Sequence, residues 1–244
     1  MNGSTNWMLE RMDKDRVPFD KLMIEAKGLG YLEADPSADI CGWDARSKLS
    51  ILARLAFGVR LDENHVVCVG IDRVTLQDVE YAKAHDRRLR LIARAWLDSL
   101  TGRVHACVMP SMVQANSTAG NLPGATNCVC FEAKYSGLNT IIGSGAGRYP
   151  TANSVVADIL EIHRRGPGCG FSHHFGSKYH CDKIVFERDF VSRFYIRGAD
   201  VTKMETGGIS YKPCGLHGEI ETEMCSYEKL VSVIGSECTV IAIL

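Results

Sequence analysis

Hydrophobic residues in the first quarter of the chain recur at the spacing of α-helices. Residues 18–30 carry apolar side chains every three or four positions, with Pro18 suited to the first helical turn. Residues 42–57 repeat that spacing over four turns. A shorter helix is expected at residues 6–12, after a glycine-containing turn at residues 2–5. The pattern therefore predicts a helical N-terminal quarter, interrupted by polar loops.

The middle of the chain changes to the apolar and polar alternation of β-strands. The predicted strands are residues 65–71, 88–97, 103–109, 127–135 and 138–143. A helix is predicted at residues 75–85, where Thr75 and Asp78 have the spacing of a capping box. Because helices and strands interleave, the pattern predicts an α+β fold, a mixed β-sheet covered by helices.

A glycine-rich turn, "GSGAGR" at residues 143–148, follows one predicted strand and leads into a predicted helix that ends near residue 163. Arg148 stands where a dinucleotide fingerprint has its third glycine, and no acidic strand end follows about 20 residues later. A complete Rossmann unit is therefore not expected. Gly143, Gly145 and Gly147 could still present backbone N–H groups to a cofactor, or could simply form a tight turn.

The regular pattern weakens after Arg165. Residues 164–181 are rich in glycine and histidine and are typical of a linker or mobile segment. Two weaker strands at 190–197 and 238–244 enclose a short helix at 226–235. The expected organisation is one domain over residues 1–165 and an extension of uncertain nature over residues 166–244.

Composition excludes several classes of protein. The 244 residues are 45% hydrophobic and 23% charged, which is enough apolar material for a sizeable core. A formal net charge of −1 gives no reason to expect nucleic acid or an anionic membrane as partner. No apolar run approaches the about 20 residues of a membrane span, and no leader is recognisable, so we expect a cytoplasmic protein.

The ten cysteines have no short pairing motif, and reduced thiols are expected. One cluster at residues 169–181 contains potential zinc ligands: Cys169, His173, His174, His180 and Cys181. Its spacing matches no standard zinc pattern, so a polar loop is the favoured interpretation and no metal is predicted.

Acidic residues gather around one lysine between residues 33 and 48. Asp44 and Lys48 are four apart on a predicted helix and share a face, while Glu33 and Asp39 lie in the loop before it. A desolvated lysine can transfer protons, and grouped carboxylates suit a substrate ammonium. From spacing alone, however, an exposed ion pair worth a few tenths of a kcal/mol is the favoured interpretation.

Three blocks of sequence favour a functional site over an exposed ion pair. Residues 2–12 ("NGSTNWMLERM"), 25–58 (which include "EADPSADICGWDARSK") and 143–159 ("GSGAGRYPTANSVVADI") resemble the substrate-binding and catalytic domain of homoserine dehydrogenase, in the same order and at similar intervals. The segments between these blocks are also similar. The resemblance covers residues 1 to about 165.

This resemblance implies an NAD(P)-dependent oxidoreductase that interconverts L-aspartate 4-semialdehyde and L-homoserine, in threonine and methionine biosynthesis. Lys48 would donate a proton to the aldehyde oxygen, or accept one from the hydroxyl in reverse. Asp44 would orient Lys48. Glu33 and Asp39 would bind polar groups of the substrate, with Glu33 taking its ammonium.

The resemblance also assigns roles outside the acidic cluster. Gly3 and Ser4 would contact substrate, although the family usually has threonine where Ser4 stands. The turn with Gly143, Gly145 and Gly147 would lie beside the nicotinamide end of the cofactor. A homodimer is implied, with no nucleic-acid or membrane partner.

Two departures from the family shape the expectations for this chain. Family members begin with a Rossmann domain that binds most of the NADP or NAD, whereas this sequence starts in the "NGST" block. We therefore expect no turnover by this chain alone, and the alternative is an inactive homologue that serves as an amino-acid-binding or oligomerisation module. In the last third, "SRFYIR" resembles the first strand of a regulatory ACT domain, so a degenerate ACT-like region or an unrelated extension is expected.

Overall fold

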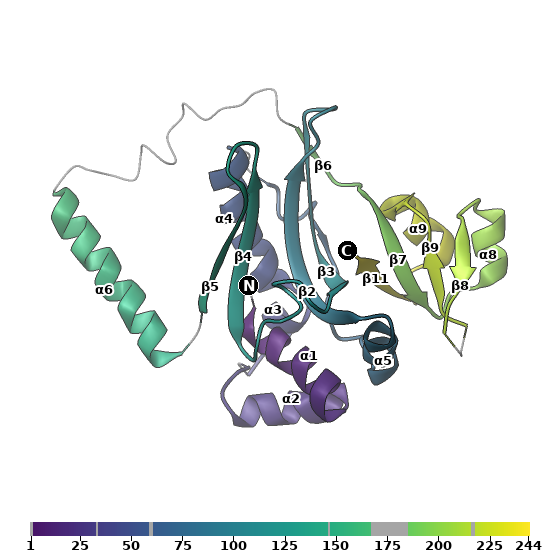
Figure 1. Ribbon diagram of the computed structural model, residues 1–244, viewed down its shortest axis with the longest axis horizontal. Coiled ribbons are helices and arrows are strands. Elements are labelled where there is room, and N and C mark those ends of the chain that lie inside the picture. The colour runs from purple at the N-terminus through teal and green to yellow at the C-terminus, as the bar shows by residue number, and fades with distance from the viewer. Residues whose placement is uncertain (1, 33, 59–60, 146, 167–184, 216–217) are drawn as a thin grey trace.

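The computed structural model describes residues 2–32, 34–58, 61–145, 147–166, 185–215 and 218–244. Its centre is a mixed β-sheet built around β3 (Arg103–Gln114), shown in Figure 1. One edge of β3 pairs antiparallel with β2 (Arg87–Leu97) along the whole of β2. The other edge pairs in parallel with three short strands, β1 (Val67–Cys68), β6 (Val185–Glu187) and β11 (Thr239–Ile243). The predicted α+β class with a mixed sheet is confirmed.

Four helices precede β1 in the chain, and a fifth comes between β1 and β2. They are α1 (Gly3–Asp15), α2 (Phe19–Gly28), α3 (Ser37–Ile40), α4 (Trp43–Phe57) and α5 (Leu76–Ala84). Helices α1, α4 and α5 contact β2, so they cover one face of the sheet. The predicted helices at 18–30, 42–57 and 75–85 are confirmed, and so is the capping box of Thr75 and Asp78.

Two expectations for the N-terminal quarter are wrong. Residues 2–5 do not form a turn, because Asn2 caps α1 by accepting a hydrogen bond from the Thr5 backbone N–H, and the helix begins at Gly3. The loop before α4 contains α3, a single helical turn that the polar sequence hid. The predicted strand at 65–71 contracts to β1, which pairs with β3 only at Val67 and Cys68.

The C-terminal part continues the same sheet. In chain order it contains β7 (Val191–Arg197), α8 (Val201–Thr206), β8 (Tyr211–Pro213), β9 (Ile220–Thr222), β10 (Cys225–Ser226), α9 (Tyr227–Ile234) and β11. The strands adjoin in the order β11, β7, β9, β8, and every pair is antiparallel. With its two helices this is a βαββαβ unit of ferredoxin-like topology, which the sequence pattern revealed only in part.

Alternate residues of β3 face two different cores. Val104, Ala106 and Val108 belong to the apolar cluster that the N-terminal helices cover. Cys107 and Met109 belong to a second cluster, formed with the C-terminal part. Because successive side chains of a strand point to opposite faces, one strand supports both halves of the molecule.

A hairpin and a helix stand apart from these cores. The hairpin is β4 (Thr126–Ala133) with β5 (Gly137–Ser144), and it leads into α6 (Arg148–Arg165), as predicted. Helix α6 has no buried residue, and Figure 1 shows it separated from the sheet. Its exposed apolar residues are Val155, Val156, Ile159, Leu160 and Ile162.

Buried charges join the C-terminal part to α5 and β2. Asp78 of α5 has no exposed surface and accepts hydrogen bonds from Arg197 Nε at 2.9 Å and from the Tyr195 hydroxyl at 3.1 Å. Glu221 of β9 is 2% exposed and accepts from the Tyr81 hydroxyl at 2.9 Å and from Arg87 at 3.0 Å. These contacts run between residues more than 110 positions apart in the chain.

We expect Glu221→Gln to lower the free energy of unfolding by about 3 kcal/mol at pH 7, because it leaves the largely buried Arg87 guanidinium without its counter-charge. Besides Arg87, the Glu221 carboxylate contacts Arg193 and Lys212, each at 3.2 Å. Urea denaturation measures the change. Glu161→Gln, which removes an exposed ion pair with Arg165 on α6, is the control and should change stability by less than about 0.5 kcal/mol.

The effect of Glu221→Gln should depend on pH. Burial alone would raise the pKa of the Glu221 carboxyl, but hydrogen bonds from Tyr81, Arg87 and Lys212 outweigh it and lower the pKa below the ordinary 4.5. Stabilisation by a carboxylate with a lowered pKa is complete above 4.5 and is lost as the pH falls through the folded-state pKa. The difference between wild type and variant should therefore shrink below pH 4.5; a constant difference down to pH 3 would contradict it.

Candidate active site

Two of the predicted acidic residues, Asp39 and Asp44, meet the predicted lysine at the N-terminal end of α4. Lys48 Nζ donates to Asp44 Oδ2 at 2.7 Å across one turn of this helix. Asn2 Nδ2 donates to Asp39 Oδ1 of α3 at 2.5 Å and to Asp44 Oδ2 at 3.3 Å. Asn2, Asp39, Asp44 and Lys48 therefore form one connected cluster, which we call the acid–lysine cluster.

The turn between α3 and α4 explains how Asp39 and Asp44 come to share that cluster. Gly42 separates the two helices with a φ of 80°, a left-handed conformation that favours glycine. A Cβ at Gly42 would also lie 3.1 Å from Val108 and 3.3 Å from the Cys68 sulfur. The glycine therefore permits both the sharp turn and its close packing on the sheet.

Asp35 has a different task from the other carboxylates. Its Oδ1 accepts from the Ser37 backbone N–H at 3.0 Å and from the Ser37 hydroxyl at 2.6 Å, which starts α3 after Pro36. The hydrogen bonds from Ser37 lower the pKa of the Asp35 carboxyl. Asp35 thus shapes the loop and stays outside the acid–lysine cluster.

The ion pair at the centre of the cluster is open to solvent. The Lys48 side chain is 48% exposed and that of Asp44 is 31% exposed. An exposed pair of this kind contributes only a few tenths of a kcal/mol to stability. Its location beside Asp39 and Asn2, with the lysine ammonium accessible, gives it the geometry to exchange a proton with a bound molecule.

Gly3 and Ser4 lie at the start of α1, directly after Asn2. The Ser4 hydroxyl donates to the Tyr31 carbonyl at 2.8 Å, which ties α1 to the loop after α2. The Tyr31 ring lies against Trp7, with ring centroids 5.3 Å apart. A Cβ at Gly3 would approach the Ala125 carbonyl to 2.9 Å, so this glycine allows α1 to touch the start of the hairpin.

The glycine-rich turn reaches the same segment from the other side. A Cβ at Gly145 would lie 1.6 Å from Asn127 Nδ2, whereas one at Gly143 would meet nothing within 4 Å. Gly147 precedes α6 with a φ of 110°. Gly3 packs closely against Ala125, and Gly145 packs closely against Asn127. The "NGST" block and the glycine-rich turn therefore both contact the segment at residues 125–127.

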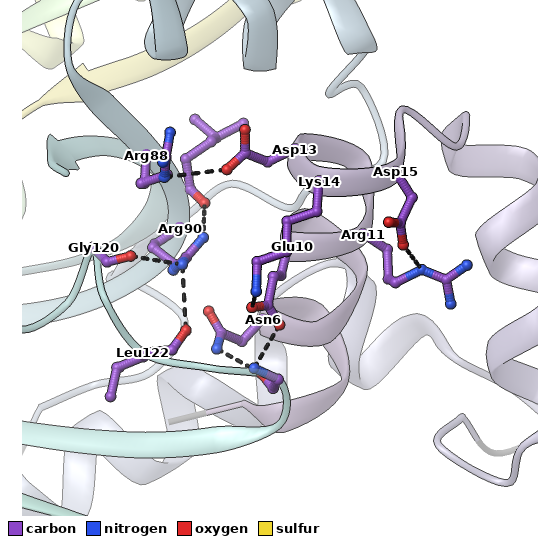
Figure 2. A network of polar contacts seen from close by, with 12 residues as sticks. Asn6, Glu10, Arg11, Asp13, Lys14, Asp15, Arg88, Arg90, Gly120 and Leu122 are labelled. Atoms are coloured by element: carbon purple, nitrogen blue, oxygen red, sulfur yellow. Dashed lines mark hydrogen bonds and ion pairs between the residues drawn. The ribbon is translucent and has the colours of Figure 1, made fainter.

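A network of polar contacts, shown in Figure 2, holds the loop before the hairpin against α1. Asn6 Nδ2 donates to the Gly124 carbonyl at 2.7 Å, and Glu10 accepts from the Gly124 backbone N–H at 2.5 Å. Arg90, which is 5% exposed, donates to the Gly120 carbonyl at 2.9 Å, and burial lowers its pKa. The network positions residues 125–127 beside Gly3.

Sequence reasoning missed Asn2, Asn6, Glu10, Arg90 and Asn127 as members of this region. Asn2 carries a usable signal, since an asparagine immediately before a helix is a preferred cap. Glu33 and the cluster at residues 169–181 lie outside the described residues.

Within the described ranges, no group of three or more histidine, cysteine or acidic side chains could hold a metal ion. Over the same ranges, no helix is long and apolar enough to cross a membrane.

The fold and this region define an α+β domain with an accessible cluster of carboxylates and a lysine beside a glycine-rich turn. The model of the family described as homoserine dehydrogenase matches residues 1–160. The chain belongs to the homoserine dehydrogenase family.

Similar proteins agree with this assignment. The NAD(+)-dependent homoserine dehydrogenase of Pseudomonas canavaninivorans is 36% identical over 164 residues, which are 67% of this chain and 46% of that protein. The homoserine dehydrogenase of Synechocystis sp. is 35% identical over 209 residues, 81% of this chain and 47% of that protein. This chain thus spans about half the length of these curated relatives.

A solved structure extends the similarity to the C-terminal part. The homoserine dehydrogenase of Thiobacillus denitrificans superposes with a TM-score of 0.84 and 25% identity, over 100% of this chain and 62% of that chain. The similarity in fold therefore includes the βαββαβ unit, beyond the part that the family model matches.

We expect Gly145→Ala to loosen the start of the hairpin, because the added methyl would overlap the Asn127 side chain. Amide hydrogen exchange at residues 126–128 should become about tenfold faster. Gly143→Ala is the matched control, since its methyl enters open space, and it should leave these amides as slow or slower. Equal exchange rates in the two variants would show that Gly145 does not require close approach.

Proposed function

We propose that this chain is the substrate-binding and catalytic part of a homoserine dehydrogenase, which interconverts L-aspartate 4-semialdehyde and L-homoserine with NAD(P). The reaction serves threonine and methionine biosynthesis. The observation that carries the proposal is the acid–lysine cluster, in which Asn2, Asp39, Asp44 and Lys48 of a family member are joined by hydrogen bonds.

Lys48 is the proton-transfer residue in this proposal. Its ammonium donates a proton to the aldehyde oxygen during reduction and, as the neutral amine, accepts the hydroxyl proton during oxidation. Asp44, 2.7 Å from Nζ, holds the lysine in place. A nicotinamide cofactor supplies or removes the hydride at the carbon that bears this oxygen.

The carboxylate of Asp39 suits the substrate ammonium, and the resemblance to the family gives Glu33 the same task. Gly3 and Ser4 are proposed to contact the substrate at the start of α1. The Ser4 hydroxyl, which donates to Tyr31, can still accept a hydrogen bond from the substrate. Substrate groups would thus be held by α1, α3 and the loop between α2 and α3.

The residues beside the glycine-rich turn fit one end of a nicotinamide cofactor. Within the described ranges, the buried Oδ1 of Asn127 has no hydrogen-bond partner and can accept from a carboxamide. Open space above Gly143 leaves room for a flat ring. Gly143, Gly145 and Gly147 would make only supporting contacts, so the choice between NAD and NADP rests on residues elsewhere.

Most of the cofactor binding is proposed to come from a nucleotide-binding part. The relatives are long enough to contain one, since this chain matches only 46% and 47% of their lengths. The exposed hairpin precedes the glycine-rich turn and the exposed apolar stripe of α6 follows it, and both would pack against that part. A stripe of aliphatic side chains on an otherwise isolated helix is costly to leave in water.

We also propose a homodimer in the cytoplasm, with no nucleic-acid partner.

The βαββαβ unit is proposed to be an ACT-like regulatory region that binds an amino acid. Its strand order supports this reading, and the proposed boundary near residue 165 would separate it from the catalytic part. Asp78 and Arg197 connect the unit to α5, and α5 contacts α1, which follows Asn2. A change in the unit would therefore reach the acid–lysine cluster through packed helices.

The chain alone is expected to show no homoserine-dependent reduction of NAD(P). We expect turnover when the proposed nucleotide-binding part of the Pseudomonas canavaninivorans relative is produced separately and added, since that part would bind the cofactor. Lys48→Met should then lower kcat by about a thousandfold, through loss of the proton-transfer group. Lys203→Met on the exposed face of α8 is the control and should leave the rate unchanged. Undiminished turnover by Lys48→Met would overturn the assignment of Lys48.

Homoserine binding to the chain tests the acidic residues separately from turnover. Asp39→Asn should weaken binding about tenfold, since a charge-assisted hydrogen bond to the ammonium is lost. Asp35→Asn, four residues earlier, keeps the contact with Ser37 and should bind homoserine normally. Calorimetry with N-acetyl-L-homoserine, which lacks the ammonium, should show no difference between Asp39→Asn and wild type. Equal homoserine affinity in all three proteins would remove Asp39 from the site, and a parallel test of Glu33→Gln decides its assignment.

A further inference from the structure

Two cysteine side chains lie side by side on the exposed hairpin. Cys128 and Cys130 are two residues apart on β4, so both point to the same face of the strand. Their sulfur atoms are 3.3 Å apart. The Thr140 hydroxyl of β5 lies 3.6 Å from the Cys130 sulfur, on the solvent side of the hairpin. This dithiol plays no part in the proposed reaction.

A disulfide is not the natural product of this pair. Residues i and i+2 of an extended strand have Cα atoms about 6.7 Å apart. That distance is at the upper limit of about 6.8 Å for a disulfide, and the bond would require the strand to bend. The regular pairing of β4 with β5 on both sides of Cys128 and Cys130 opposes such bending.

The weak acidity of the Cys128 thiol also disfavours its oxidation at neutral pH. Burial, with the neighbouring Cys130 thiol, raises the pKa of Cys128 to about 11. The thiolate is the nucleophile in disulfide exchange and alkylation, so a protonated Cys128 thiol reacts slowly. A ligand that accepts two thiol protons as it binds does not meet this barrier.

The separation of the two sulfurs fits one atom held between them. Tetrahedral zinc, with bonds of about 2.3 Å, holds two ligand sulfurs about 3.8 Å apart and needs two further ligands. The 3.3 Å separation corresponds to an angle of about 90° at a central atom with bonds of that length. Angles near this value occur at pyramidal trivalent arsenic, which has a lone pair in place of a fourth ligand and is a soft centre of the kind that thiolates bind well.

We propose that Cys128 and Cys130 form a dithiol site that chelates a trivalent arsenical. With phenylarsine oxide, two arsenic–sulfur bonds form and the arsenic–oxygen bond breaks. The two thiol protons leave with that oxygen as one water molecule, and arsenic remains trivalent. Because both sulfurs are already adjacent, the second bond closes a ring at little entropic cost. The site adjoins Asn127 on β4, one residue from the contact with Gly145.

The test is retention of phenylarsine oxide by the whole chain in excess glutathione, followed by intact-mass spectrometry. Wild type should keep one phenylarsenic group, which 2,3-dimercaptopropanol should remove. Cys128→Ser and Cys130→Ser should each weaken retention by about a hundredfold or more, since one thiol cannot chelate. Cys238→Ser changes a thiol that donates a hydrogen bond to the Gly198 carbonyl, and this variant should retain the phenylarsenic group as wild type does.

Competing thiols are tested with a second variant and with peptide mapping. The double variant Cys169→Ser/Cys181→Ser should retain phenylarsenic fully. In wild type, bound phenylarsenic should protect Cys128 and Cys130 from iodoacetamide. Retention that depends on Cys169 and Cys181, or equal retention by both single serine variants and wild type, would overturn the proposal. These outcomes are independent of whether the chain takes part in homoserine oxidation.

Discussion

The fold depends on the hydrogen bonds that β3 makes along both of its edges. Its antiparallel ladder with β2 fixes the surface on which α1, α4 and α5 pack. Its parallel ladders with β1, β6 and β11 bring in segments from both ends of the chain. Since a central strand leaves no backbone group unpaired, it can be buried on both faces, and β3 is buried over most of its length.

The acid–lysine cluster inherits its geometry from this arrangement. Asp39 and Asp44 come from two helices that meet at Gly42, which has a left-handed φ and where a Cβ would lie only 3.1 Å from Val108 of β3. The side-chain N–H₂ group of Asn2 then joins the two carboxylates, while its side-chain oxygen Oδ1 caps α1. One amide thus serves both folding and site assembly, because its N–H₂ and C=O groups are used at the same time.

Local patterns predicted the elements better than their assembly. The capping box at Thr75 and the ion pair between Asp44 and Lys48 need only short-range spacing, and both were predictable. By contrast, the parallel pairing of β11 with β3 joins residues about 130 positions apart, and no local period encodes it. The same holds for the site, since Gly145 and Asn127 meet only once the hairpin has formed.

Polar sequence also hid structure in the first quarter. The stretch around Pro36 reads as a loop, yet Asp35 and Ser37 start a helical turn through side-chain contacts that compete with helix propensity elsewhere. Glycine at position 3 argues for a turn, but here its lack of a side chain serves close approach to Ala125 within a helix. Residue type alone did not distinguish these uses of glycine.

The distribution of burial indicates which part of the molecule is self-sufficient. The aliphatic and aromatic side chains of the two clusters on β3 are at most 9% exposed, and the βαββαβ unit contributes to both clusters. The hairpin and α6 contribute no comparable core, although α6 carries five exposed aliphatic residues along one helix. Isolated helices gain most of their stability from packing an apolar face. Helix α6 therefore gains stability when that face is covered, whereas the sheet and its helices already have their core. Under the proposed function, substrate recognition would reside in the self-sufficient part, and hydride transfer would depend on a cofactor-binding part that covers the hairpin and α6.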